Sequence, residues 1–219
     1  MKSGTACKLC FSTDSILYCH KSSMEVLKCC NCHLIFTPLS KGIKEIENHY
    51  SKQYFDPYLD SQAVHLEKRF GERLQELKRI KFPGLLLDVG CGIGIFLKAA
   101  HDAGYDTVGL EISQYAIEYA RKKYGLDVLN CDLENSKLSQ KKFDVITLWH
   151  VLEHVTDPVE FLAKIKNLLK KDGILAIEVP NIGSFAAKIS GLNWEMMAPD
   201  EHFSFFTMET LTRLLEEKS

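Results

Sequence analysis

Four cysteines near the N-terminus have the residue type and spacing of a metal site. Cys7 and Cys10 form one C-x2-C pair, and Cys29 and Cys32 form a second pair after an interval of 18 residues. Two short turns at this spacing can present four thiolates tetrahedrally to zinc. The sequence therefore predicts a zinc ribbon with a structural Zn²⁺, whose folding depends on the metal because the segment is too small to form a core.

Two features of this segment leave alternatives open. Cys30 and His33 could replace one of the four predicted ligands, and the segment could also be a metal-free remnant of a ribbon. Ribbon turns usually carry glycine after the second cysteine, whereas Phe11 and His33 occupy these positions. We therefore expect strained turns.

A glycine-rich loop provides the second chemical signal. Asp88-Val89-Gly90-Cys91-Gly92-Ile93-Gly94 follows an apolar run and precedes a helical pattern. Glycines allow a tight turn between strand and helix, and they let a ligand approach the backbone near the free N–H groups of the helix N-terminus. This arrangement predicts a site for a small polar cofactor.

The spacing of the glycines discriminates between cofactors. A dinucleotide-binding loop has the pattern G-x-G-x-x-G, but here the third glycine comes one position early. The pattern therefore disfavours a nicotinamide cofactor. Glu111 ends the next apolar run and could accept hydrogen bonds from ribose hydroxyls.

Alternating apolar runs and helical patterns must position these residues. Apolar runs begin near Leu85, Thr107, Asp127, Phe143 and Gly173, with helical stretches between several of them. Short apolar runs of this kind are typical of buried parallel strands. The sequence predicts an α/β fold of the doubly wound, Rossmann-like class.

From Leu85 to Val179 the motifs, in this order, resemble those of class I S-adenosylmethionine-dependent methyltransferases. The resemblance implies that the glycine loop surrounds the methionine part of the cofactor, that Glu111 holds the ribose, and that Ile112 and Asp132 contact the adenine. The cofactor-binding residues expected on this basis are Asp88, Gly90, Cys91, Gly92, Gly94, Glu111, Ile112, Asp132, Leu133 and His150.

The segment after the fourth predicted strand resembles an L-E-H-x-x-D-P motif of small-molecule O-methyltransferases and of sugar- or lipid-tailoring relatives. His154 is then a candidate general base, because a neutral imidazole can take a proton from an attacking hydroxyl. His202, in a later aromatic run, is a second candidate catalytic residue. Structural roles for both histidines remain open, since methyl transfer needs little beyond alignment. In related quinone O-methyltransferases this region is linked to a divalent metal, but His150 replaces a carboxylate here.

Three zones are expected along the chain: the zinc ribbon over residues 1–40, a helical linker or lid over 41–82, and the cofactor-binding domain over 83–219. The lid hypothesis rests on aromatic residues at Tyr50, Tyr54 and Phe55. The resembling family continues into two further strands that complete a seven-stranded sheet, so we expect this sheet to lack its last strands.

Composition excludes several partners. The formal net charge is −2 and no basic block is present, so nucleic acid is not an expected partner. No apolar run approaches the length of a membrane span, which predicts a cytoplasmic protein.

The expected acceptor is a small molecule, a sugar or a lipid-linked compound. The alternatives are a non-catalytic cofactor-binding module with a partner-binding ribbon and, less favoured, a nicotinamide-dependent enzyme.

Overall fold

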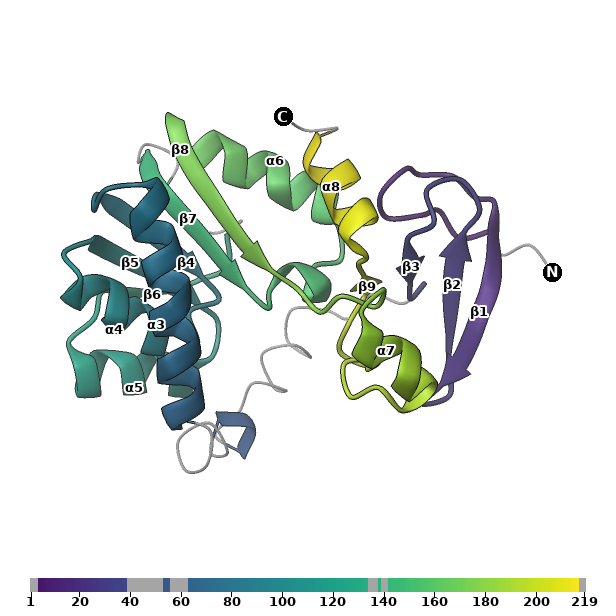
Figure 1. The fold of residues 1–219 in the computed structure, drawn as a ribbon, viewed down its shortest axis with the longest axis horizontal. Coiled ribbons are helices and arrows are strands. Elements are labelled where there is room, and N and C mark those ends of the chain that lie inside the picture. The colour runs from purple at the N-terminus through teal and green to yellow at the C-terminus, as the bar shows by residue number, and fades with distance from the viewer. Residues whose placement is uncertain (1–3, 39–52, 56–62, 134–137, 139–141, 217–219) are drawn as a thin grey trace. The chain divides into compact units, whose positions relative to one another are not determined.

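The computed structural model of the 219-residue chain describes residues 4–38, 53–55, 63–133, 138 and 142–216. The chain forms two compact units, each built from segments that are separate in sequence (Figure 1). One unit contains Met1–Lys41, His150–Ala163 and Glu178–Ser219, and the other contains Gly42–Trp149 and Lys164–Ile177. We call them the ribbon unit and the sheet unit.

The sheet unit is built on a five-stranded sheet in the order β6-β5-β4-β7-β8. Strand β4 pairs in parallel with β5 and β7, and β5 pairs in parallel with β6. The strands and their helices are β4 (Leu85–Val89), α4 (Ile95–Asp102), β5 (Asp106–Glu111), α5 (Gln114–Tyr124), β6 (Val128–Asn130), β7 (Phe143–Trp149) and β8 (Leu169–Glu178). Helix α6 (Pro158–Leu168) precedes β8, and its residues up to Ala163 belong to the ribbon unit. Parallel strands buried by flanking helices are the expected result of the alternating apolar pattern. The prediction of an α/β fold is confirmed.

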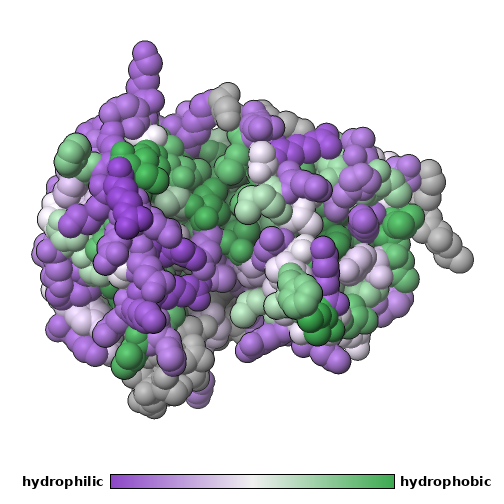
Figure 2. All heavy atoms as spheres, viewed as in Figure 1, coloured by the Kyte–Doolittle hydropathy of each residue, from purple (hydrophilic) through white to green (hydrophobic). Residues whose placement is uncertain are grey.

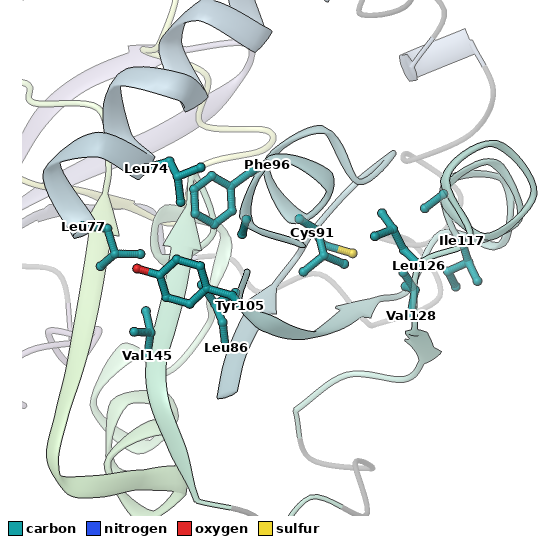
Figure 3. Packing of buried hydrophobic residues seen from close by; sticks show 13 residues of the cluster. Leu74, Leu77, Leu86, Cys91, Phe96, Tyr105, Ile117, Leu126, Val128 and Val145 are labelled. Atoms are coloured by element: carbon teal, nitrogen blue, oxygen red, sulfur yellow. The ribbon is translucent and has the colours of Figure 1, made fainter. Parts of the chain in front are cut away.

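The core of the sheet unit lies between the sheet and the helices that flank it (Figure 3). Leu74 and Leu77 of α3 (Ala63–Ile80) pack with Phe96 of α4 and with Leu86 and Val145 of the sheet. A second group, Ile117, Leu126 and Val128, joins α5 to β6. Within the range 41–82, for which the sequence predicted a helical linker, α3 is therefore an amphipathic helix whose apolar side is part of the core.

The ribbon unit contains a four-stranded sheet in the order β1-β2-β3-β9. Strands β1 (Ser15–Lys21), β2 (Met24–Cys29) and β3 (Ile35–Phe36) come from the cysteine-rich segment, and β9 (Ser204–Phe205) comes from the end of the chain. Ile35 lies opposite Phe205 and Phe36 opposite Ser204 in an antiparallel pairing. Short helices α7 (Phe185–Ser190), η2 (Gly191–Asn193) and α8 (Met208–Glu216) complete the C-terminal part, and η1 (Leu152–His154) follows β7.

Several predicted boundaries differ from the observed ones. Strand β8 begins at Leu169, four residues before the predicted Gly173, because α6 ends at Leu168. Asp157 caps α6, since its Oδ1 accepts the N–H of Glu160 at 2.9 Å. The three predicted domain zones remain predictions, and Tyr50 of the hypothetical lid lies outside the described residues.

None of the helices in the described part of the chain is long and apolar enough to cross a membrane. Hydrophobic atoms do appear on the surface shown in Figure 2, along β8 and over α7, where Phe185 and Ile189 are exposed. Exposed apolar side chains in small groups are normal for folded proteins.

Gly109 on β5 is closely packed. A Cβ at this position would lie 2.7 Å from the Sγ of Cys91 and 2.8 Å from Cδ2 of Leu97. We expect Gly109→Ala to lower the free energy of unfolding by about 1–3 kcal/mol through overpacking. Urea unfolding followed by circular dichroism measures the change. Gly71→Ala in α3 is the matched control, because open space surrounds that position and alanine favours a helix. Equal unfolding midpoints for Gly109→Ala and the unchanged protein would contradict the close packing around Cys91.

Candidate cofactor site and cysteine centre

The glycine loop forms the turn between β4 and α4, as predicted. Gly90, Gly92 and Gly94 all have positive φ angles, of 69°, 54° and 83°, which residues with a Cβ rarely adopt. The N–H groups of Gly90 and Cys91 donate to the carbonyl oxygen of Leu110, at 2.8 and 3.1 Å. These bonds fix the loop at the carboxyl end of β4, next to the end of β5.

The carboxylate of Glu111 ties this loop to the next one. Its Oε2 accepts the N–H of Gly92 at 2.8 Å, and its Oε1 accepts the N–H groups of Ile112 and Ser113 at 2.8 and 2.9 Å. Burial raises the pKa of Glu111, and the three N–H groups oppose that rise. A carboxylate has about four acceptor positions. In this rotamer Glu111 therefore keeps about one position for a ribose hydroxyl, fewer than the two expected from the sequence.

Asp88 lies at the same edge of the sheet and is fully buried. Its Oδ1 accepts the hydroxyl of Thr147 at 2.6 Å, while its Oδ2 is buried without a hydrogen-bond partner in the described part of the chain. Burial raises the pKa of Asp88 to about 7, the hydrogen bond from Thr147 opposes this rise, and the nearby charge of Glu111 adds to it. A buried carboxylate oxygen without a partner favours the approach of a cation or a donor.

Thr147 was not among the site residues predicted from the sequence. This residue lies opposite Asp88 in the parallel pairing of β4 and β7, and it is buried. Its hydroxyl stands within the apolar part of β7, between Ile146 and Leu148, which was the signal that the sequence offered.

Other predicted cofactor residues follow the neighbouring strands. Ile112 directly follows β5, and Asp132 and Leu133 come two and three residues after the end of β6. Asp132 is half-buried, Leu133 and Cys91 are buried, and burial raises the pKa of the Cys91 thiol well above its usual value. All of these residues belong to the sheet unit.

The three predicted histidines belong instead to the ribbon unit. The rings of His154 and His202 lie edge to face with centroids 4.7 Å apart. The Nδ1 atoms of both rings lie within hydrogen-bond distance of backbone oxygens, those of Glu201 at 3.1 Å and Met196 at 2.8 Å. If these Nδ1 atoms carry the protons, each Nε2 is left as an acceptor.

His150 differs from the other two histidines. It has a φ of 57°, and its Nδ1 lies 3.1 Å from Oε1 of the buried Glu153. Its Nε2 lies 3.5 Å from Oε1 of Glu178. The ring is thus held between two carboxylates.

Burial lowers the pKa of His154 to about 4, although the carboxylate of Glu153 opposes this shift. His154 is therefore neutral at pH 7. One donor atom from each of Glu153, His154 and His202 lies within 4.8 Å of the others, a chemistry that suits a divalent cation.

The four predicted cysteine ligands converge in the ribbon unit. One Sγ from each of Cys7, Cys10, Cys29 and Cys32 lies within 4.8 Å of the other three. The Sγ atoms of Cys7 and Cys32 are 3.4 Å apart and those of Cys10 and Cys29 are 3.5 Å apart, so neither pair is a disulfide. Four thiolates around zinc would be about 3.8 Å apart, given a Zn–S distance of about 2.3 Å. The thiols therefore fit a tetrahedral zinc.

The two cysteine turns have the same backbone geometry. The N–H of Phe11 donates to the carbonyl oxygen of Cys7 at 3.0 Å, and the N–H of His33 donates to that of Cys29 at 3.1 Å. Phe11 and His33 both have positive φ angles, of 59° and 64°. The strain predicted for these two turns is therefore present, because side chains occupy positions that favour glycine. Cys30 is exposed and is not part of the four-sulfur group.

Comparison with known proteins gives the family. The family described as "Methyltransferase domain" matches residues 62–218. A curated relative, the ubiquinone biosynthesis O-methyltransferase of Actinobacillus pleuropneumoniae, is 32% identical over 139 residues, covering 58% of this chain and 59% of the relative. The protein of the same name from Cereibacter sphaeroides strain ATCC 17025 is 35% identical over 125 residues, covering 53% of this chain and 51% of the relative. The chain thus spans less than two thirds of the length of these relatives.

Solved structures show the same fold. A SAM-dependent methyltransferase from Thermotoga maritima, described as a possible histamine N-methyltransferase, matches with a TM-score of 0.59 and 26% identity, over 75% of this chain and 78% of that one. A magnesium protoporphyrin IX methyltransferase from Synechocystis, solved with bound SAH, matches with a TM-score of 0.64 and 18% identity, over 81% and 89%. The chain belongs to the methyltransferase domain family and has the Rossmann-like fold of the class I S-adenosylmethionine-dependent methyltransferases.

Proposed function

We propose that this protein transfers a methyl group from S-adenosylmethionine to a small-molecule acceptor. The observation that carries the proposal is the loop edge of the sheet unit, where Gly90–Gly94, the buried Asp88 and Glu111 meet. Bound there, the cofactor supplies an activated methyl group on a sulfonium, which is a good leaving group. The protein's task is to bind and align the two reactants.

The residues of this edge suit the charges and hydroxyls of that cofactor. Oδ2 of Asp88 offers a carboxylate oxygen to a cationic ligand, and Glu111 retains an acceptor position for a ribose hydroxyl. Ile112, Asp132, Leu133 and His150 remain proposed contacts. A nicotinamide cofactor is disfavoured by the spacing of the glycines.

The acceptor class is proposed from the relatives. Those described above are named for ubiquinone biosynthesis, which supports a small phenolic acceptor methylated on oxygen. Sugars and lipid-linked compounds are the other acceptors expected from the sequence. We propose His154 as the proton acceptor in the reaction and His202, whose ring lies beside it, as a second catalytic residue.

The second candidate function is a non-catalytic cofactor-binding protein whose ribbon contacts a partner. The low basicity of His154 supports it, because a base with a pKa of about 4 is a weak proton acceptor at neutral pH. Turnover of bound cofactor separates the two functions.

Cofactor binding is tested by calorimetric titration of the full chain with S-adenosylmethionine and S-adenosylhomocysteine, using NADH as a negative control. We expect binding of both adenosyl compounds, and a loss of about tenfold or more in Asp88→Asn and in Glu111→Gln, since each removes a charged hydrogen-bonding group. Asp127→Asn is the matched control, because Asp127 is exposed. Binding of NADH alone would overturn the assignment.

The role of His154 is tested with an acceptor found by screening phenols and sugar nucleotides for release of S-adenosylhomocysteine. At saturating cofactor we expect kcat/KM to fall as the pH drops below about 5, because His154 then gains a proton. His154→Gln is expected to lower kcat/KM by about 100-fold. The exposed His101→Gln is the control. If kcat/KM of His154→Gln falls by less than about threefold, His154 is not a catalytic base, and this region contributes to catalysis only by aligning the reactants.

We also propose that the ribbon holds one structural Zn²⁺. Metal analysis is expected to find one zinc per chain, lost in Cys10→Ser and Cys32→Ser but retained in Cys30→Ser, which changes the exposed neighbour of Cys29. Because β2 ends at Cys29, removing zinc with a chelator should unfold the ribbon strands. Zinc-free protein with unchanged circular dichroism and thermal stability would contradict this role.

A further inference from the structure

Thr147 has no role in the proposed chemistry, yet it makes one of the shortest hydrogen bonds at the loop edge. Its hydroxyl donates to Oδ1 of Asp88 at 2.6 Å and also lies 3.4 Å from the carbonyl oxygen of Leu87. Thr147 is completely buried. The parallel pairing of β4 and β7 places it directly opposite Asp88, so the contact follows from the register of the sheet.

We propose that Thr147 is a positioning residue for the cofactor, which orients the Asp88 carboxylate and stabilises its ionised form for a cationic ligand. The proposal rests on the proposed function, because it assumes that the cofactor is S-adenosylmethionine. Its geometric basis is that the two oxygens of Asp88 have different surroundings. Oδ1 is held by Thr147, while Oδ2 is buried and has no hydrogen-bond partner in the described residues.

The surroundings of Asp88 make the hydroxyl important. Glu111 from β5 brings a second negative charge, and Cys91 from the loop is a buried neutral thiol, so neither group stabilises an ionised Asp88. The Thr147 hydroxyl is the hydrogen bond that opposes the effect of burial on the pKa of Asp88, which lies at about 7. Near neutral pH, Asp88 is therefore divided between its protonated and ionised forms.

A cation favours the ionised form, and S-adenosylmethionine carries both a sulfonium and an ammonium. Binding must therefore displace a proton from the fraction of molecules in which Asp88 is protonated. The direction in which affinity changes with pH follows from this linkage. The contribution of Asp88 to affinity should level off about one pH unit above its pKa, and affinity should weaken as the pH falls through that pKa, by up to about tenfold per pH unit.

The test is calorimetric titration of the full chain with S-adenosylmethionine between pH 5.5 and 9, in two buffers that differ in ionisation enthalpy. We expect the unchanged protein to release protons on binding below pH 7. Thr147→Val has nearly the same shape but no hydroxyl, so the pH midpoint of affinity should move upward, with a loss of about tenfold at pH 7. Thr147→Ser restores the donor and should restore the midpoint.

Several outcomes separate the inference from the proposed function. If Thr147→Val keeps the original midpoint, or if Thr147→Ser behaves like Thr147→Val, Thr147 does not act through Asp88 and the inference is overturned. If Thr147→Val fails to fold, Thr147→Cys decides, because a thiol of similar size is a weaker donor and should give an intermediate midpoint. Absence of binding at every pH in the unchanged protein would instead overturn the proposed function, and the inference with it.

Discussion

Three backbone N–H groups from two loops converge on the buried carboxylate of Glu111, and the shape of the loop edge depends on this convergence. Without it, the N–H of Gly92 would lose its hydrogen-bond acceptor, and the glycine turn would keep only the bonds of Gly90 and Cys91 to Leu110 among its described links to the end of β5. This arrangement costs free energy, because it buries the carboxylate of Glu111 close to a second carboxylate, that of Asp88. The protein offsets that cost with backbone donors at Glu111 and with a single hydroxyl at Asp88. A negative and rigid edge results, suited to a cation that also carries hydroxyls.

In the ribbon unit, the backbone of Phe203 joins separate segments of the chain, as Glu111 does in the sheet unit. Its N–H donates to the carbonyl oxygen of Glu153 at 2.7 Å, and its own carbonyl oxygen accepts the N–H of Thr37 at 3.1 Å. One residue thus links the cysteine-rich segment to the segment that carries His150 and His154. The cysteine-rich segment is therefore part of the framework that holds the histidines.

Some parts of the molecule could be predicted from the sequence more fully than others. The alternating apolar runs predicted where β4 to β8 lie along the chain, because parallel buried strands have a strong local pattern. The cysteine spacing predicted the four converging sulfur atoms, and the missing glycines predicted strained turns at Phe11 and His33. The link between Thr147 and Asp88 was not predicted, since it depends on the register between two strands. The lowered pKa of His154 depends on burial by segments distant in sequence, which no local pattern reports.

The pairing of β3 with β9 also has a consequence for biosynthesis. Its partners are about 170 residues apart, whereas β4, β5, β6 and β7 all lie within one short stretch of chain. As the chain leaves the ribosome, the strands of the sheet unit can pair while β9 has not yet been synthesised. During that interval β3 has an open edge, which is a site for pairing with other chains.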